Sequence, residues 1–178
     1  MNIIIVTLNT ASVALLKQIQ GIHNIRIAQS YNQALSVFDQ IRLEKEASNL
    51  SEKDYIMLTE FDIPLANGCD SQPLNCITLC KEAAKRHYPL IIVGLRPHSC
   101  NHETIALVNS LGKQEPNQWY ITKQEMQTAN ELSTIVYFVK LPILTHGVDE
   151  TLLRPEAYDW PAIITTVKKN IAKENINA

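Results

Sequence analysis

Residues 55–68 read YIMLTEFDIPLANG and join a short apolar run to a turn. The apolar run at residues 55–59 predicts a buried β-strand. Pro64, Asn67 and Gly68 follow it, and these residue types favour a turn because proline fixes φ, whereas asparagine and glycine tolerate positive φ. The stretch therefore predicts a strand that leaves its sheet through a turn.

The same order of elements continues on both sides of this stretch. Apolar runs predict further strands at residues 3–6, 25–28 and 90–93. Ser30 and Gln33 match a capping box, which predicts a helix from Tyr31. Helical spacing is found in four sets of residues: Val13, Leu16 and Ile19, ended by Gly21; Ala34, Leu35, Phe38 and Ile41; Ile77, Cys80 and Ala84; and residues 103–111, closed by Gly112. Strands that alternate with helices predict a parallel sheet.

Two candidates for a fifth strand follow, at residues 119–122 and 134–139. The second is longer and more β-branched, so it is assigned to the sheet, and residues 119–133 are treated as an added segment. Whether Lys123 or Lys140 ends the fifth strand stays open. Residues 44–53 and 144–158 are predicted as loops outside the core, the first including a frayed helix end. Asp159 is predicted to cap a last helix with Pro161 in its first turn and Ile163, Val167 and Ile171 on its inner face.

These elements predict one domain over residues 1–178. Its expected architecture is a doubly wound three-layer α/β/α fold with a five-stranded parallel sheet, and extra segments before and after the fifth strand. Sixteen basic and 18 acidic residues are spread along the chain, so nucleic acid is not an expected partner. The start MNIIIVT is unlike a signal peptide and no apolar run is long enough to span a membrane. We expect a soluble, cytoplasmic protein whose four cysteines are free thiols.

A family resemblance enters at residues 60–68, EFDIPLANG. This stretch resembles the signature of response-regulator receiver domains, in which a phosphoacceptor aspartate is followed four residues later by proline and then by an Asp/Asn-Gly turn. Glu60 stands at the acceptor position. Pro89 before the fourth strand and residues 137–142, YFVKLP, are similar to later parts of the receiver pattern, with Lys140 as the lysine and Leu141 as an extra residue before Pro142.

The departures from the receiver pattern imply a changed function. Thr7 and Leu8 stand where receivers carry an acidic pair for Mg²⁺, and Gly94 stands where they carry a Ser or Thr. Because Mg²⁺ prefers carboxylate oxygens, the loss of that pair predicts the loss of magnesium binding and of phosphoryl transfer. The resemblance therefore implies a pseudo-receiver: a phosphorylation-independent signalling module that binds a protein partner or a second copy of itself, with no cofactor.

Several interpretations of single residues stay open at this stage. Glu60 could be an ordinary strand-end carboxylate, or it could imitate the phosphorylated state permanently. Alternatively, Asp62 could serve as the phosphoacceptor in its place. Lys140 could pair with Glu60 or point into solvent, and Asn9 could cap a helix or act as a polar ligand.

Cysteines and histidines suggest a second function class, a small α/β enzyme or ligand-binding domain. His98, Cys100 and His102 cluster after the fourth strand, and Cys69, Cys76, Cys80 and His87 lie on or near the third helix. No complete zinc pattern and no activated-nucleophile motif surrounds them, so neither a metal nor a catalytic residue is assigned.

Overall fold

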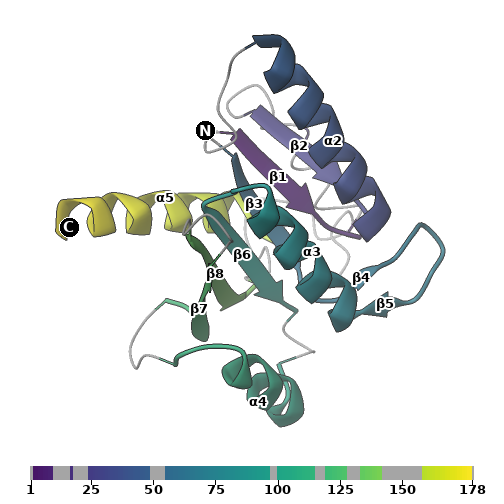
Figure 1. Cartoon of the computed structure of the whole chain (residues 1–178). Helices are drawn as coiled ribbons and strands as arrows, with labels where there is room; N and C mark the ends of the chain where they lie inside the picture. Colours follow the sequence, from purple (N-terminus) through teal and green to yellow (C-terminus); the bar gives the residue numbers. More distant parts are fainter. Residues whose placement is uncertain are drawn as a thin grey trace.

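A six-stranded sheet forms the centre of the protein (Figure 1). The computed structural model describes residues 2–9, 17, 24–48, 55–96, 100–114, 119–127, 133–141 and 158–177. The strand order is β2 (Asn24–Ala28), β1 (Asn2–Val6), β3 (Tyr55–Glu60), β6 (Leu90–Leu95), β8 (Ser133–Lys140) and β7 (Thr122–Gln127). The first five strands of this order are mutually parallel, and β7 runs antiparallel to β8.

The five predicted parallel strands are confirmed, but the prediction of a five-stranded sheet is wrong by one strand. The segment at residues 119–133 contributes β7, which begins at Thr122 rather than ending there. Residues 134–139 do belong to the buried sheet, as β8, and β8 ends at Lys140. The outer strand β7 pairs residue by residue with β8 from Thr122 opposite Phe138 to Gln127 opposite Ser133.

Helices pack against both faces of the sheet (Figure 1). On one face lie α2 (Tyr31–Ser48) and α3 (Pro73–Lys85), whose apolar side chains share a core with alternate residues of the strands; Val108 of α4 (His102–Ser110) joins this core. On the other face α5 (Trp160–Asn177) buries Trp160, Ile163, Ile164 and Val167. The period-two alternation of strand residues supplies both cores.

The predicted starts of two helices are confirmed by their capping bonds. The backbone N–H of Gln33 donates to the Ser30 hydroxyl over 3.2 Å, and α2 begins at Tyr31. The N–H of Ala162 donates to Asp159 Oδ1 over 3.0 Å at the start of α5. Each cap satisfies an N–H that has no partner within the helix.

Two local predictions need correction. The helix α2 continues to Ser48, and Lys45 is buried with its ammonium 5.0 Å from the centre of the Tyr55 ring, so residues 44–48 are not a loop outside the core. Gly112 follows α4 without a positive φ; a Cβ there would lie 2.3 Å from the carbonyl oxygen of Lys123, so close backbone approach explains the glycine. Apart from Lys17, the predicted helix at residues 13–19 lies outside the described residues. So do Gly21, residues 49–53 of the first predicted loop, Pro142, and residues 144–157 of the second.

The turn after β3 is part of a small hairpin formed by β4 (Ile63–Pro64) and β5 (Ser71–Gln72). Gly68 has a φ of 83°, and the N–H of Cys69 donates to the carbonyl of Ala66 over 3.1 Å. Positive φ at the third position of such a turn favours glycine, as the sequence predicts. The carbonyl of Leu65 accepts from the N–H of Asn32, which ties the hairpin to the start of α2.

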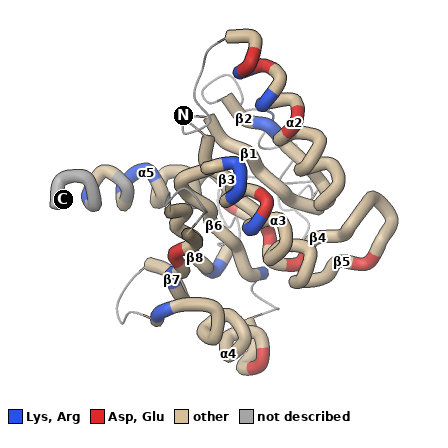
Figure 2. The backbone as a smooth tube through the Cα atoms, viewed as in Figure 1, with Lys and Arg blue, Asp and Glu red and all other residues tan. Residues whose placement is uncertain are grey.

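Charged residues occur on each of the helices α2, α3, α4 and α5. Figure 2 shows both signs along α2 and along α3. Across the described ranges, no helix is both long and apolar enough to cross a bilayer.

Candidate functional site

The carboxyl edge of the parallel strands brings four receiver-motif positions together. Glu60 ends β3 directly opposite Gly94 of β6, and Val6 at the end of β1 lies opposite Thr59. Thr7 and Leu8 therefore leave β1 beside Glu60. Parallel strands end at a common edge, and this is where open α/β sheets place ligands.

Glu60 is a buried carboxylate with partners from two other strand ends. Its side chain has no exposed surface. The N–H of Leu8 donates to Oε2 over 3.0 Å, and Arg96 Nη2 lies 3.5 Å from the same oxygen. The other oxygen, Oε1, has no hydrogen-bond partner among the described residues. The carboxylate is therefore half satisfied, which is costly for a buried charged group.

Burial raises the pKa of the Glu60 carboxyl above its ordinary value of 4.5. The Leu8 N–H, the positive charge of Arg96 and the Thr7 hydroxyl oppose that rise without cancelling it. Desolvation therefore outweighs the favourable contacts, and Glu60 holds its proton more tightly in the folded chain than in the unfolded one.

This raised pKa predicts a pH dependence of stability. Between 4.5 and the folded-state pKa, the native chain binds more protons than the unfolded chain, so the free energy of unfolding should fall as pH rises through that window. Glu60→Gln should remove this contribution. Urea denaturation of both proteins from about pH 5 to about pH 8 measures it as the difference between their slopes. Parallel pH profiles would contradict the assignment.

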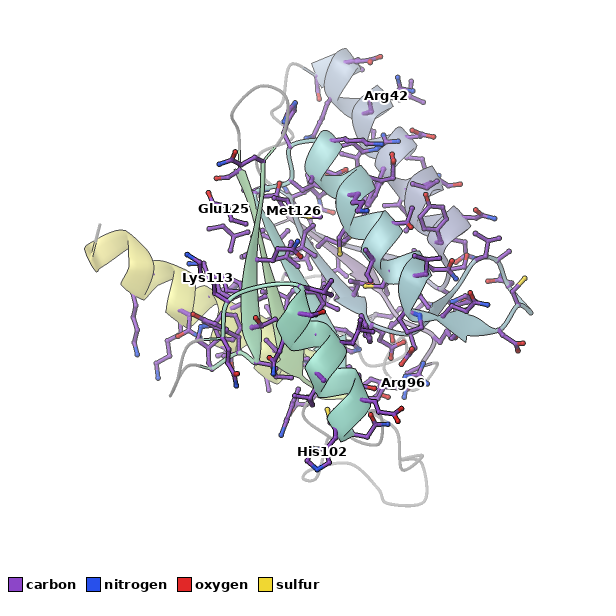
Figure 3. The ribbon with its side chains drawn as sticks, turned by 60° about the horizontal axis from the view of Figure 1, so that its bottom comes forward. Arg42, Arg96, His102, Lys113, Glu125 and Met126 are labelled. Carbon is purple, nitrogen blue, oxygen red and sulfur yellow. The ribbon has the colours of Figure 1, made fainter. Side chains whose placement is uncertain are left out.

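Arg96 is the cation that sequence reasoning missed. It follows β6 by one residue, and its side chain is 20% exposed. Figure 3 shows Arg96 at the same end of the protein as His102. The structure pairs Glu60 with Arg96 rather than with Lys140, whose side chain is exposed at the end of β8. The sequence signal that could have identified Arg96 is a basic residue directly after the fourth predicted parallel strand, two positions beyond Gly94.

Gly94 has a packing role. A Cβ at this position would lie 2.2 Å from Cδ2 and 2.5 Å from Cγ of Leu141. The N–H of Leu141 donates to the carbonyl of Leu95, which prolongs the pairing of β8 with β6. The Leu141 side chain, which is only 2% exposed, therefore occupies the space that a larger residue at position 94 would need.

The remaining candidates do not gather around Glu60. Pro64 is buried, and Asn67 and Gly68 are exposed in the hairpin turn. Asp62 is half-buried, and its charge acts on the thiol of Cys76 on α3. Asn9 lies near Glu60, where its N–H donates to the Thr7 hydroxyl over 3.2 Å.

The thiols of Cys76 and Cys100 show no sign of activation. The Cys100 thiol donates to the carbonyl of Arg96 over 3.3 Å, and burial raises its pKa. A hydrogen bond to Cys80 and burial raise the pKa of Cys76 well above its usual range. Raised thiol pKa values lower the thiolate fraction that a nucleophile needs. In the part of the chain that the structure describes, which excludes His98, no group of three acidic, Cys or His residues could hold a metal ion.

A cavity of about 130 Å³ lies at this edge of the sheet. Its lining residues are Leu8, Asn9, Glu60, Arg96 and Tyr158. The fold and this edge define an α/β protein with a mostly parallel sheet and a buried Glu–Arg pair at its carboxyl edge. Comparison with protein-family models, curated proteins and solved structures finds no match for the chain.

Proposed function

We propose that the chain is a receiver-like regulatory domain that works without phosphorylation and acts by binding a protein. The order of its parallel strands supports this proposal, because β2-β1-β3-β6-β8 corresponds to the 2-1-3-4-5 order of flavodoxin-like doubly wound folds. Order alone does not establish function, so the argument depends on the site at the carboxyl edge.

The observation that carries the proposal is the internal pairing of Glu60. At the acceptor position of the receiver pattern, the carboxylate is buried and bound to the Leu8 N–H and to Arg96. A divalent cation at Glu60 would meet the guanidinium charge and would find neither of the two carboxylates that Thr7 and Leu8 replace. The Arg96 charge thus takes the place of the metal, and a phosphoryl donor would have to displace Arg96.

A coupled change at Gly94 supports the same proposal. Gly94 lacks the hydroxyl that receivers use at this position, and the extra residue Leu141 fills the space that the glycine leaves. The glycine at position 94 and the extra residue Leu141 thus depend on each other, because the Leu141 side chain packs where a side chain at position 94 would lie.

The proposed binding surface lies around α4 and β7. The resemblance to receiver domains implies a surface at the fourth helix and fifth strand. Because β7 covers the outer edge of β8, we place the surface at α4 and β7 instead. On α4, Leu107 is 45% exposed and would offer an apolar side chain to a partner. The partner would be another protein or a second copy of the chain.

The alternative of an enzyme that uses the loop after β6 gains no support from Cys100. Its thiol is occupied by the Arg96 carbonyl and has a raised pKa. His102 is exposed on α4, and His98 lies outside the described residues.

Incubation with Mg²⁺ and acetyl phosphate should leave the intact mass of the protein unchanged. Glu60→Asp restores the family's acceptor residue, and this variant should also stay unmodified because the metal ligands and the hydroxyl are still missing. A conventional receiver in the same reaction verifies the reagent. A stable phosphoryl adduct on the native chain would refute the proposed function, and Asp62→Asn would then test the acceptor.

A further inference from the structure

Two unsatisfied polar atoms belong to residues that line one cavity. Glu60 Oε1, an acceptor, and Arg96 Nε, a donor, are both buried, and neither has a hydrogen-bond partner within the described ranges. Both residues line the cavity of about 130 Å³ with Leu8, Asn9 and Tyr158. Buried polar groups are nearly always satisfied, so an acceptor and a donor left over on two residues that line one cavity indicate a missing partner.

The place of this cavity in the sheet is a second, independent indication. From β1 the chain passes to β2 on one side, and β3 lies on the other side. This reversal of strand order opens a crevice beyond the carboxyl ends of β1 and β3, which is where Leu8, Asn9 and Glu60 lie. Open α/β sheets bind their ligands at such switch points.

The charges around the cavity limit the class of ligand. Glu60 and Arg96 form an ion pair, so an anion would be repelled by the carboxylate and a cation by the guanidinium. The atoms that still need hydrogen-bond partners are one acceptor, Glu60 Oε1, and one donor, Arg96 Nε. An N–H beside a C=O satisfies both, and this arrangement is the hydrogen-bonding edge of an amide.

We propose that this cavity binds a small uncharged amide, either a primary amide or the cyclic amide edge of a nucleobase, with its N–H on Glu60 and its C=O on Arg96. Ligand binding would then replace phosphorylation as the signal at the same edge of the sheet. Only this regulatory role rests on the proposed function; the binding itself does not.

The test is a titration of the ¹⁵N-labelled full chain, followed through the amide signal of Leu8. Nicotinamide represents primary amides and uracil represents nucleobases. Nicotinate is the anionic control, and methyl nicotinate lacks the N–H donor. At least one amide should bind about tenfold more tightly than both controls, because each lost hydrogen bond to a charged group leaves a buried partner unsatisfied.

Variants of the Glu–Arg pair test the assignment to this cavity. Glu60→Met and Arg96→Lys should each abolish the preference for the amide, the first because methionine has no carboxylate to accept the ligand N–H and the second because lysine keeps the charge but lacks Nε. Asp39→Asn removes an exposed carboxylate that accepts from Arg86 elsewhere, and it should bind as the native chain does. The ¹⁵N spectrum of each variant verifies folding.

Three results would overturn the inference: no binding by either amide, which would mean that water alone satisfies the two atoms; equal binding of amides and controls; or an unchanged preference in folded Arg96→Lys. The phosphorylation assay contains no amide ligand, so it tests the proposed function independently of amide binding.

Discussion

Arg96→Met is expected to lower the free energy of unfolding at pH 7 by up to about 3.5 kcal/mol. Glu60 is fully buried, and Arg96 is its only ion-pair partner among the described residues. Methionine keeps much of the volume of the arginine stem and removes the charge. The buried carboxylate would then keep only the hydrogen bond from the Leu8 N–H. Removing one partner of a buried ion pair destabilises a fold because it leaves the other charge uncompensated.

Protonation of Glu60 sets the upper limit of this loss. Holding a glutamate neutral at pH 7 costs about 1.4 kcal/mol for each pH unit above its ordinary value of 4.5, or about 3.5 kcal/mol over 2.5 units. The loss caused by Arg96→Met should therefore shrink as pH falls, and it should nearly vanish near 4.5. Urea denaturation at pH 7 and near pH 5 measures both values.

Arg86→Met is the matched control. Arg86 donates to Asp39 over 3.1 Å, and the side chain of Asp39 is 54% exposed. Exposed pairs contribute only about 0–1 kcal/mol, so this variant should lose little stability and show no comparable change between the two pH values. An Arg96→Met loss of equal size at both pH values would mean that Arg96 stabilises the fold by packing instead of by its charge.

Local sequence signals predicted most of the fold. The capping residues Ser30 and Asp159 act within three residues of their partners, so their roles can be inferred without knowledge of the tertiary structure. The parallel strands β1, β3, β6 and β8 bury apolar residues on both faces, which gives them a nearly continuous apolar signal. The strand β7 reads TKQEMQ and has no apolar alternation. β7 is held as a strand by its pairing with β8, and the local sequence of residues 122–127 gives no sign of this pairing.

The candidate site was predictable in position but not in its contacts. The receiver pattern singled out Glu60, and the parallel order implied that β1 and β6 would end beside it. Which cation reaches Glu60 depends on how the chain leaves β6 and β8. Arg96 turns back to the carboxylate, whereas Lys140 is exposed. The contact between Gly94 and Leu141 joins residues 47 positions apart, so neither residue alone signals it.

Gly94→Ala should lower the free energy of unfolding by about 1–3 kcal/mol, although one methyl group is the whole change. The new Cβ would lie within 2.9 Å of three Leu141 side-chain atoms, so no rotation of one branch relieves the overlap. In a Leu141→Ala background, which is itself destabilised by lost packing, the added cost of Gly94→Ala should disappear. Urea denaturation of the four proteins completes this cycle.

Gly112→Ala separates this contact from a general intolerance of alanine at glycine positions. Its Cβ would meet the backbone carbonyl of Lys123 at 2.3 Å, so its cost should be the same in the native chain and in the Leu141→Ala background. If Gly94→Ala cost as much without the Leu141 side chain as with it, the glycine would be required by the backbone of β6. The coupling of the two departures from the receiver pattern would then be refuted, because position 94 could not regain a side chain even after Leu141 was removed.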